Sequence, residues 1–571
     1  MSILQRSLLS FLFLLLLVKN SSSDTIRKNS NTNINNINNG NDKNKNNNNE
    51  SCLFQSGHPD RMKEIPGWDH PLPSAWYSGY LEYKLEGQTV HTHYVLVQAE
   101  QIEDHDGDDD EEKEKDNDLP LIYWSNGGPG ASSLFGLLTE IGPLMLSDES
   151  LKTQEYTNTG IPTPIYNKYS WSRLGSILMI DQPAPVGFSY CNDDDIKNSS
   201  SHSCGGIAWT DELTSLNAYT ALQTFYKTKF PCLIEKQLYL TGESYGGIYI
   251  PTLARRIVEN NEKIDDDDDT DVIALNLKGF AVGDGCLGTQ TSMCGELADP
   301  SQGFTGYWNL LFMAGHHQIP LHDFKMVMKA CSHSEQPGFL TSFGQKDDIC
   351  RAAIVSIKKE IGGFFEYALY DDCTYRNGLQ RKKTFDYLEG ALNDYPCGAG
   401  PVLEEYLKLK PILHAFHVRS EFFEVDNAEG DFDYTTTEPD VQPFYKKMNG
   451  KLKILVYNGD TDPAITSFAA QNWTSHLGFD EISHWRPWTI DGCQQMGGYV
   501  ERYEGHFDFL TIRGAGHMVP TYKPAASFAF LKAWLRDEEY PIFDKNCTKP
   551  LSSSSYDETG TMMDIIEAEK Q

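Results

Sequence analysis

Short apolar runs that end at turn-forming residues recur along most of the chain. We predict five of them to be strands: Leu119–Trp124, Ser176–Ile180, Gln237–Leu240, Leu277–Val282 and Lys453–Tyr457. Helical patterns, such as Trp209–Phe225, lie between some of these runs. Strand–helix alternation over several hundred residues predicts an α/β domain with a mostly parallel central sheet.

The stretch from about 286 to 397 breaks this alternation. It holds six of the twelve cysteines, so we predict a disulfide-rich cap inserted over the sheet. Two acidic runs are interpreted as solvated surface loops: 103–118, an overgrown hairpin loop between Thr92–Val97 and the next strand, and 259–271. Calcium binding by the aspartates is the alternative, but the spaced ligands and turn glycine of a known calcium loop are missing.

The two ends of the chain differ from the middle in composition. Residues 1–23 hold an arginine, an apolar run and then small polar residues, which is typical of a secretory signal peptide. An asparagine-rich leader at 24–50 is predicted to be disordered and 550–571 to be a flexible tail, which leaves 51–549 as the folded domain. No other stretch approaches the roughly 20 apolar residues of a transmembrane helix, so we expect no membrane anchor.

The net charge and the cysteine pattern exclude some classes of partner and indicate the compartment of the protein. A formal charge of −33 disfavours contact with phosphate backbones, so we expect no nucleic-acid partner. An even number of cysteines fits an oxidising compartment, and the absence of a CxxC pair argues against a zinc ribbon. We expect no metal and no cofactor. With the signal peptide, four N-glycosylation sequons predict a glycoprotein of the secretory pathway, secreted or lysosomal/vacuolar: Asn49, Asn198, Asn472 and Asn546.

A pentapeptide of the form GxSxG stands at Gly242–Gly246, between a predicted strand and a helix-compatible run. A sharp strand-to-helix turn needs small residues around it and lifts a serine hydroxyl clear of the backbone. Ser244 is therefore the candidate nucleophile. The alternative is an ordinary glycine turn with a solvent-facing serine. It becomes less favoured once a candidate base and a candidate orienting carboxylate for this serine are found.

Candidate partners follow later strands. His517 lies on a glycine-flanked loop after His506–Arg513, and His506 is the weaker rival for the base. Asp460 and Asp462 compete to orient the base; we prefer Asp462 because Asp460 is better placed to cap the Gly-Asp turn. The chain order Ser–Asp–His is that of α/β-hydrolases.

A glycine-rich turn after Leu119–Trp124 can supply an oxyanion hole. We expect its donors to be the backbone N–H groups of Gly128 and of Tyr245, which follows the nucleophile. A phosphate-binding loop is the alternative interpretation, but the Gly-Lys-Ser/Thr ending is absent.

With these motifs the chain closely resembles the serine carboxypeptidase family. The matching stretches follow the family's order and are spread over most of 52–540: Trp124–Pro143, Ile180–Tyr190, Thr241–Ala254, Leu277–Asp284, Tyr457–Asp462 and Gly514–Pro524. The resemblance implies an α/β-hydrolase fold with Ser244, Asp462 and His517 as the triad, and Gly128 and Tyr245 as the oxyanion hole.

The same resemblance places Asn126, Glu140 and Glu243 around the C-terminal carboxylate of a peptide substrate. An ionised Glu243 would repel that carboxylate. Two carboxyl groups that share a proton in a partly buried site have at least one raised pKa, and the protonated group can donate a hydrogen bond. The alternative is that Glu243 only caps the elbow.

Two positions depart from the family pattern. Ala131 stands where many members have a cysteine, so the family's bridge to the position matched by Cys397 cannot form, and Cys397 is expected to be free or paired differently. Asp284 replaces a frequent asparagine, a change that we expect to leave activity intact.

The expected function is hydrolysis of C-terminal residues from peptides and proteins through an acyl-enzyme, with an acidic pH optimum. The expected partners are substrates with a free C-terminus. Two alternatives remain: an acyltransferase that passes the acyl group to an alcohol, and a protective or binding protein without turnover. An intact triad and oxyanion loop argue against the second.

Overall fold

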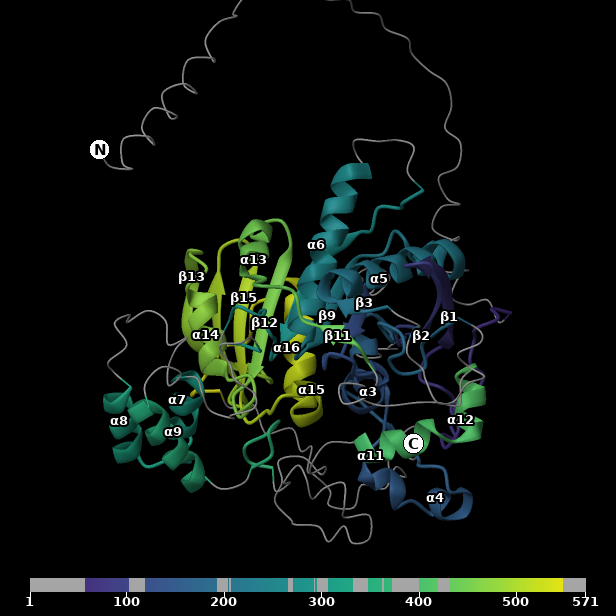
Figure 1. Ribbon diagram of the computed structural model, residues 1–571. Coiled ribbons are helices and arrows are strands. Elements are labelled where there is room, and N and C mark those ends of the chain that lie inside the picture. The colour runs from purple at the N-terminus through teal and green to yellow at the C-terminus, as the bar shows by residue number, and fades with distance from the viewer. Residues whose placement is uncertain are drawn as a thin grey trace, which may run out of the picture. The chain divides into compact units, whose positions relative to one another are not determined.

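A large mixed sheet forms the centre of the computed structural model (Figure 1). The structure describes residues 57–101, 119–192, 204, 207–264, 271–291, 293–294, 307–331, 348–361, 364–371, 400–419 and 432–547. All of them belong to one unit, Asn48–Gln571.

The sheet has a parallel centre and antiparallel edges. Its strands in spatial order are β1 (Trp76–Leu85), β2 (Gln88–Val97), β6 (Ser176–Ile180), β3 (Leu121–Ser125), β9 (Leu238–Glu243), β10 (Leu277–Gly283), β12 (Lys453–Gly459), β15 (Phe507–Ile512), β14 (Met496–Tyr503) and β13 (Glu481–Thr489). The short β7 (Tyr190–Cys191) pairs with β2. Every neighbouring pair from β6 to β15 is parallel.

Helices bury both faces of this sheet. Along β9, Leu238 and Leu240 join one apolar core with α5 (Asp211–Thr224) and α6 (Gly246–Ile264). Tyr239 points to the other face and packs in the core that contains α16 (Pro524–Arg536). Strand side chains alternate between the faces, so two covered faces require continuous apolar runs. The sequence has such runs, and the predicted α/β class with a mostly parallel sheet is confirmed.

The structure describes further helices and strands. The other helices are α3 (Leu134–Gly136), α4 (Gln154–Thr159), α7 (Tyr307–Gly315), α8 (Leu321–Ala330), α9 (Asp348–Ile361), α11 (Gly400–Leu407), α12 (Lys410–Ala415), α13 (Gln442–Met448), α14 (Ser467–Ser475) and α15 (Val519–Tyr522). Single helical turns are η2 (Leu137–Ile141), η3 (Asp148–Leu151), η4 (Trp171–Arg173), η6 (Phe225–Lys229) and η7 (Pro231–Leu233). Two small strand pairs are β4 (Leu144–Met145) with β5 (Ile165–Tyr166), and β8 (Trp209–Thr210) with β11 (Tyr434–Thr435).

Two details of the sequence interpretation are wrong. The run 103–118 does not join a hairpin, because β6 lies between β2 and β3 and pairs with both. The run 259–271 is not a loop throughout, since α6 continues to Ile264 before the aspartates begin. The first detail could not be predicted from local patterns, because strand order depends on β6, which is distant in the sequence.

The described part of the predicted cap has an apolar core of its own. Side chains from α7, α8 and α9 pack together there, including Leu310, Val327 and Ile357. The disulfide Cys286–Cys294 lies at the start of this region. Two further bridges, Cys191–Cys204 and Cys493–Cys547, lie elsewhere in the described residues, and Cys397 lies outside them.

Several sequence predictions fall outside the described residues: the segments 1–23, 24–50, 103–118 and 550–571, and the sequons at Asn49 and Asn198. Of the other sequons, Asn546 is exposed near the end of the domain and Asn472 is half-buried in α14. Among the helices that the structure describes, none has the length and apolar character needed to cross a membrane.

Candidate active site

The candidate residues meet at one edge of the sheet. Four parallel strands, β3, β9, β12 and β15, each lead at the carboxyl end into a segment that carries candidate residues, and β10 lies between β9 and β12. Open α/β sheets commonly place their sites at this edge, because loops from adjacent strands converge there.

Ser244 stands at a tight turn between β9 and α6. Its backbone is left-handed, with φ +59°, which a non-glycine residue adopts rarely. Its N–H donates to the carbonyl of Gly283, and its own carbonyl accepts from the N–H of Cys286. A Cβ at Gly247 would lie 2.3 Å from the carbonyl oxygen of Cys286, so glycine is needed for α6 to approach this segment. The half-buried serine is thus held in a fixed, strained elbow.

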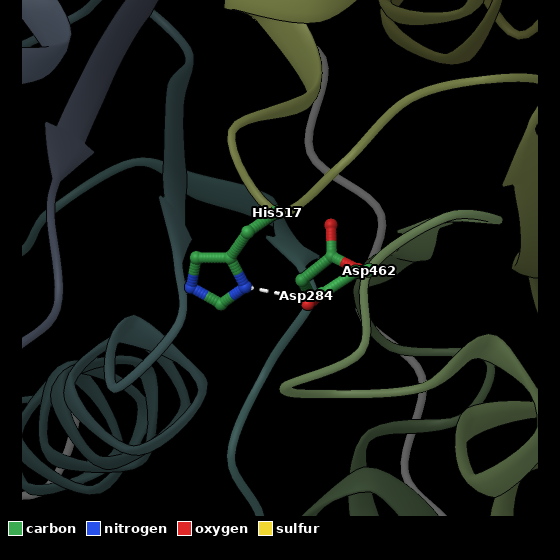
Figure 2. A group of neighbouring side chains, drawn as sticks. All are labelled: Asp284, Asp462 and His517. Carbon is green, nitrogen blue, oxygen red and sulfur yellow. Dashed lines mark hydrogen bonds and ion pairs between the residues drawn. The ribbon is translucent and has the colours of Figure 1, made fainter. Parts of the chain in front are cut away.

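His517 and Asp462 form a buried pair (Figure 2). Nδ1 of His517 lies 2.7 Å from Oδ2 of Asp462, and the other carboxylate oxygen, Oδ1, accepts from the N–H of Ala464. The backbone N–H of His517 donates to the carbonyl of Tyr367. Nε2 of His517 is buried and has no hydrogen-bond partner among the described residues, so the Ser244 hydroxyl does not bond to it here. Such contacts often tighten only with substrate.

The two rival residues have other positions. Asp460 accepts a hydrogen bond of 2.6 Å from the N–H of Gly514, which ties the β12 loop to the loop of His517. His506 precedes β15, at the end of the sheet opposite His517, and its Nδ1 lies 3.4 Å from Asp537. The geometry therefore pairs His517 with Asp462.

Two backbone amides near the elbow are available as donors. Within the described residues, neither the N–H of Gly128 nor that of Tyr245 donates a hydrogen bond. A Cβ at Gly127 would lie 2.3 Å from the nitrogen of Tyr245, so the glycine turn after β3 packs directly against the elbow. Only glycine permits this approach.

Asn126, Glu140 and Glu243 form a buried cluster beside Ser244. Nδ2 of Asn126 donates to Oε1 of Glu140 at 3.1 Å and to Oε1 of Glu243 at 3.0 Å. Oδ1 of Asn126 accepts from the indole of Trp124, which fixes the orientation of the amide. The second oxygen of each glutamate is buried without a hydrogen-bond partner in the described residues.

Burial raises the pKa of Glu140 and of Glu243 above the ordinary range of a glutamate. For Glu243 the negative charge of Glu140 raises the pKa further, while the Asn126 hydrogen bonds oppose the shift in both groups. Two ionised carboxylates that are buried and bonded to the same amide repel strongly, so the pair holds at least one proton at mildly acidic pH.

This pair should make the protein less stable as pH rises. Between the ordinary pKa of a glutamate and the raised value, the folded state binds more protons than the unfolded state, so the free energy of unfolding falls as pH rises. The expected loss is about 1.4 kcal/mol per pH unit for one group. Urea denaturation of the wild type at pH 5 and at pH 7 measures it.

The Glu243→Gln variant should show a weaker loss over the same interval because it lacks one of these protons. The control variant Glu404→Gln removes an exposed carboxylate bonded to Lys408 and should keep the wild-type slope. Equal slopes in all three proteins would contradict the raised pKa of the pair.

Sequence reasoning missed two contacts of this site. Asp284, noted only as a departure from the family pattern, is fully buried next to Asp462 and His517. Its place directly after a buried strand indicates the edge of the sheet at which it lies, but does not identify Asp462 as its neighbour. Tyr367, from the predicted cap region, supports the histidine loop through its carbonyl, and its ring centre lies 5.0 Å from that of His517. No local pattern marks that contact.

By distance alone, two groups of side chains in the described residues could reach a cation: Asp284, Asp462 and His517; and Glu481, His484 and Glu501. In the first group the hydrogen bond between His517 Nδ1 and Asp462 occupies the positions that would face the ion. In the second group His484 already lies 2.5 Å from Glu481 and both are on the surface. Neither arrangement resembles a closed metal site.

Comparison with known sequences identifies relatives along most of the chain. The profile of a family described as "Serine carboxypeptidase" matches residues 66–537. Putative serine carboxypeptidase-like 30 of Arabidopsis thaliana is 31% identical over 437 residues, which cover 73% of this chain and 80% of the relative. The lysosomal protective protein of Mus musculus is 27% identical over 517 residues, covering 84% and 94%.

A solved structure has the same fold. A prohormone-processing carboxypeptidase from Saccharomyces cerevisiae superposes with a TM-score of 0.59 at 18% sequence identity, and the match covers 84% of this chain and 95% of that one. Chains this different in sequence share an architecture, and the likeness supports the α/β-hydrolase fold.

Proposed function

The chain belongs to the serine carboxypeptidase family, and we propose that it cleaves the last peptide bond of peptides and proteins through an acyl-enzyme on Ser244. The observation that carries this proposal is the buried carboxyl pair of Glu140 and Glu243. Glu243 directly precedes the proposed nucleophile, so a terminal carboxylate bound by the pair places the last peptide bond beside the serine.

The reaction uses Ser244 as nucleophile and His517 as general base. As Oγ of Ser244 bonds to the carbonyl carbon, its proton passes to Nε2 of His517, which then protonates the leaving amine as the C–N bond breaks. Water repeats these steps on the ester and releases the shortened peptide. Asp462 stabilises the imidazolium, and the N–H groups of Gly128 and Tyr245 stabilise the oxyanion.

Recognition of the terminal carboxylate requires a proton on the glutamate pair. The two Oε2 atoms have no partner among the described residues, and one of them, when protonated, donates a hydrogen bond to the substrate carboxylate. An ionised pair repels the same carboxylate. Affinity should therefore fall as pH rises through the raised pKa of the pair.

The Glu243→Gln variant tests this recognition. In the wild type, loss of one proton from the pair should lower kcat/KM by about tenfold per pH unit on the alkaline side. A glutamine cannot ionise, so this alkaline fall should be weaker in the variant. The acidic limb should remain, because the substitution does not alter the general base. The measurement is kcat/KM against pH for blocked dipeptides with a free C-terminus.

Matched substrates provide the control. Amidated dipeptides lack the terminal charge, so the variant and the wild type should cleave them with nearly the same pH dependence. Equal cleavage of free and amidated peptides by the wild type, or an unchanged alkaline limb in the variant, would exclude the carboxylate-recognition role. Turnover of acyl-glucose donors without peptide cleavage would instead favour an acyltransferase.

The pH dependence suits an acidic compartment. We propose that the protein enters the secretory pathway and acts in a lysosome-like or vacuolar compartment, or outside the cell. The three disulfides of the described residues support an oxidising route, and the mouse relative is named as lysosomal.

A further inference from the structure

A buried carboxyl group that the proposed mechanism does not use lies against the triad. Asp284 follows β10 and has no exposed surface. Its Oδ1 accepts from Nδ2 of Asn458 at 3.0 Å and from the N–H of Gly459 at 3.1 Å. These contacts fix the side chain at the start of the loop that carries Asp462.

Asp284 is close enough to act on the triad directly. A carboxylate oxygen of Asp284, a carboxylate oxygen of Asp462 and a ring nitrogen of His517 all lie within 4.8 Å of one another (Figure 2). The other ionisable groups that act on Asp284 are Glu243, at the end of β9, and Tyr457, in β12. Asp462 and Glu243 are acidic and Tyr457 carries no positive charge, so among these groups only the imidazole of His517 can become a cation, when it accepts the Ser244 proton during the reaction.

We propose that Asp284 stays protonated while the enzyme works and donates its carboxyl proton to the carboxylate of Asp462. It is a positioning residue: it holds Asp462 toward Nδ1 of His517 without touching the substrate. This inference rests on the proposed function, because it assigns a task within the same triad.

The charges of the neighbouring groups favour the neutral, protonated form of Asp284. If Asp284 and Asp462 were both ionised, one imidazole would face two buried anions a few ångströms apart, and desolvation of a second charge is costly. Burial and the charge of Asp462 hold the pKa of Asp284 well above its ordinary value, against the opposing effect of the Gly459 hydrogen bond. A protonated carboxyl also supplies the donor that a second carboxylate lacks.

The first experiment measures the pKa of His517 in the wild type and in Asp284→Asn. The probe is NMR of the Nδ1 proton and ring nitrogens, assigned by their loss in His517→Gln. Asparagine is the same size, cannot ionise and keeps a donor, so the pKa of His517 should change by less than about 0.3 units. An ionised Asp284 would predict that its removal lowers this pKa by about 1–3 units, because a nearby anion stabilises the imidazolium.

The second experiment separates donation from shape. Asp284→Leu keeps the branched shape but removes both the donor and the oxygen that accepts from Asn458 and Gly459, so the rate at which Ser244 reacts with a fluorophosphonate should fall about 10–100-fold. Asp284→Asn keeps a donor and an acceptor and should stay within about threefold of the wild type. Asp508→Asn, which alters a buried carboxyl bonded to Arg502 and distant from the triad, controls for general loss of stability. Tryptophan fluorescence confirms that each variant is folded.

These readouts remain informative if the peptide specificity is wrong, because neither needs a peptide substrate. A lowered His517 pKa in Asp284→Asn, or equal labelling rates in the Leu and Asn variants, overturns the proposal for Asp284. If Asp284→Leu does not fold, the NMR titration of Asp284→Asn still decides whether the group is neutral. Normal labelling together with no cleavage of any peptide would instead overturn the proposed function.

Discussion

Replacing Ser244 with alanine is expected to abolish labelling by a serine-directed fluorophosphonate and to lower kcat on peptides by about 10⁶-fold. The reason is positional: among the candidate residues only Ser244 combines a left-handed elbow, a free amide on the next residue and a glycine turn packed against it. Residual turnover would come from the oxyanion amides and from substrate binding. The measurement is single-turnover cleavage of a blocked dipeptide.

A surface serine provides the control for this change. Ser475→Ala removes an exposed hydroxyl at the end of α14 and should leave both labelling and kcat unchanged. Full labelling of the Ser244→Ala protein would show that another residue is the nucleophile and that the elbow has been misinterpreted.

Much of this site could be predicted because its parts are local. The elbow at Gly242–Gly246 needs small residues beside a strand end, and the glycine turn before Pro129 needs backbone freedom. A few adjacent residues meet each requirement, so both can be recognised in the sequence. The mostly apolar run Lys453–Tyr457 likewise predicted a strand, which the structure shows as β12.

The strand order and the surroundings of Asp284 could not be predicted, because they depend on contacts between segments that are far apart in the sequence. The prediction of a hairpin around 103–118 was wrong because β6, more than fifty residues later in the sequence, lies between β2 and β3. The burial of Asp284 beside Asp462 depends in the same way on the parallel pairing of β10 with β12. Local patterns carry no information about such pairings, so the charge of Asp284 could be argued only from the structure.

Changing Asp462 to asparagine is expected to lower kcat by about 10³–10⁴-fold with a much smaller change in KM. The variant keeps the shape of the loop, but an amide cannot stabilise the imidazolium and favours the wrong tautomer of His517 at the 2.7 Å contact with Nδ1. Steady-state kinetics on a blocked dipeptide at the pH optimum, with fluorophosphonate labelling alongside, measures the loss.

The matched control is Asp460→Asn, which makes the same chemical change two residues earlier. Asp460 accepts from the N–H of Gly514 and does not contact His517, so its replacement should lower the melting temperature by a few degrees and leave kcat within about tenfold of the wild type. Both variants retain an oxygen that accepts a hydrogen bond, so a difference between them reports charge at the imidazole rather than loop geometry. If Asp460→Asn caused the larger loss of kcat, the orienting carboxylate would be Asp460 and the triad assigned here would be wrong.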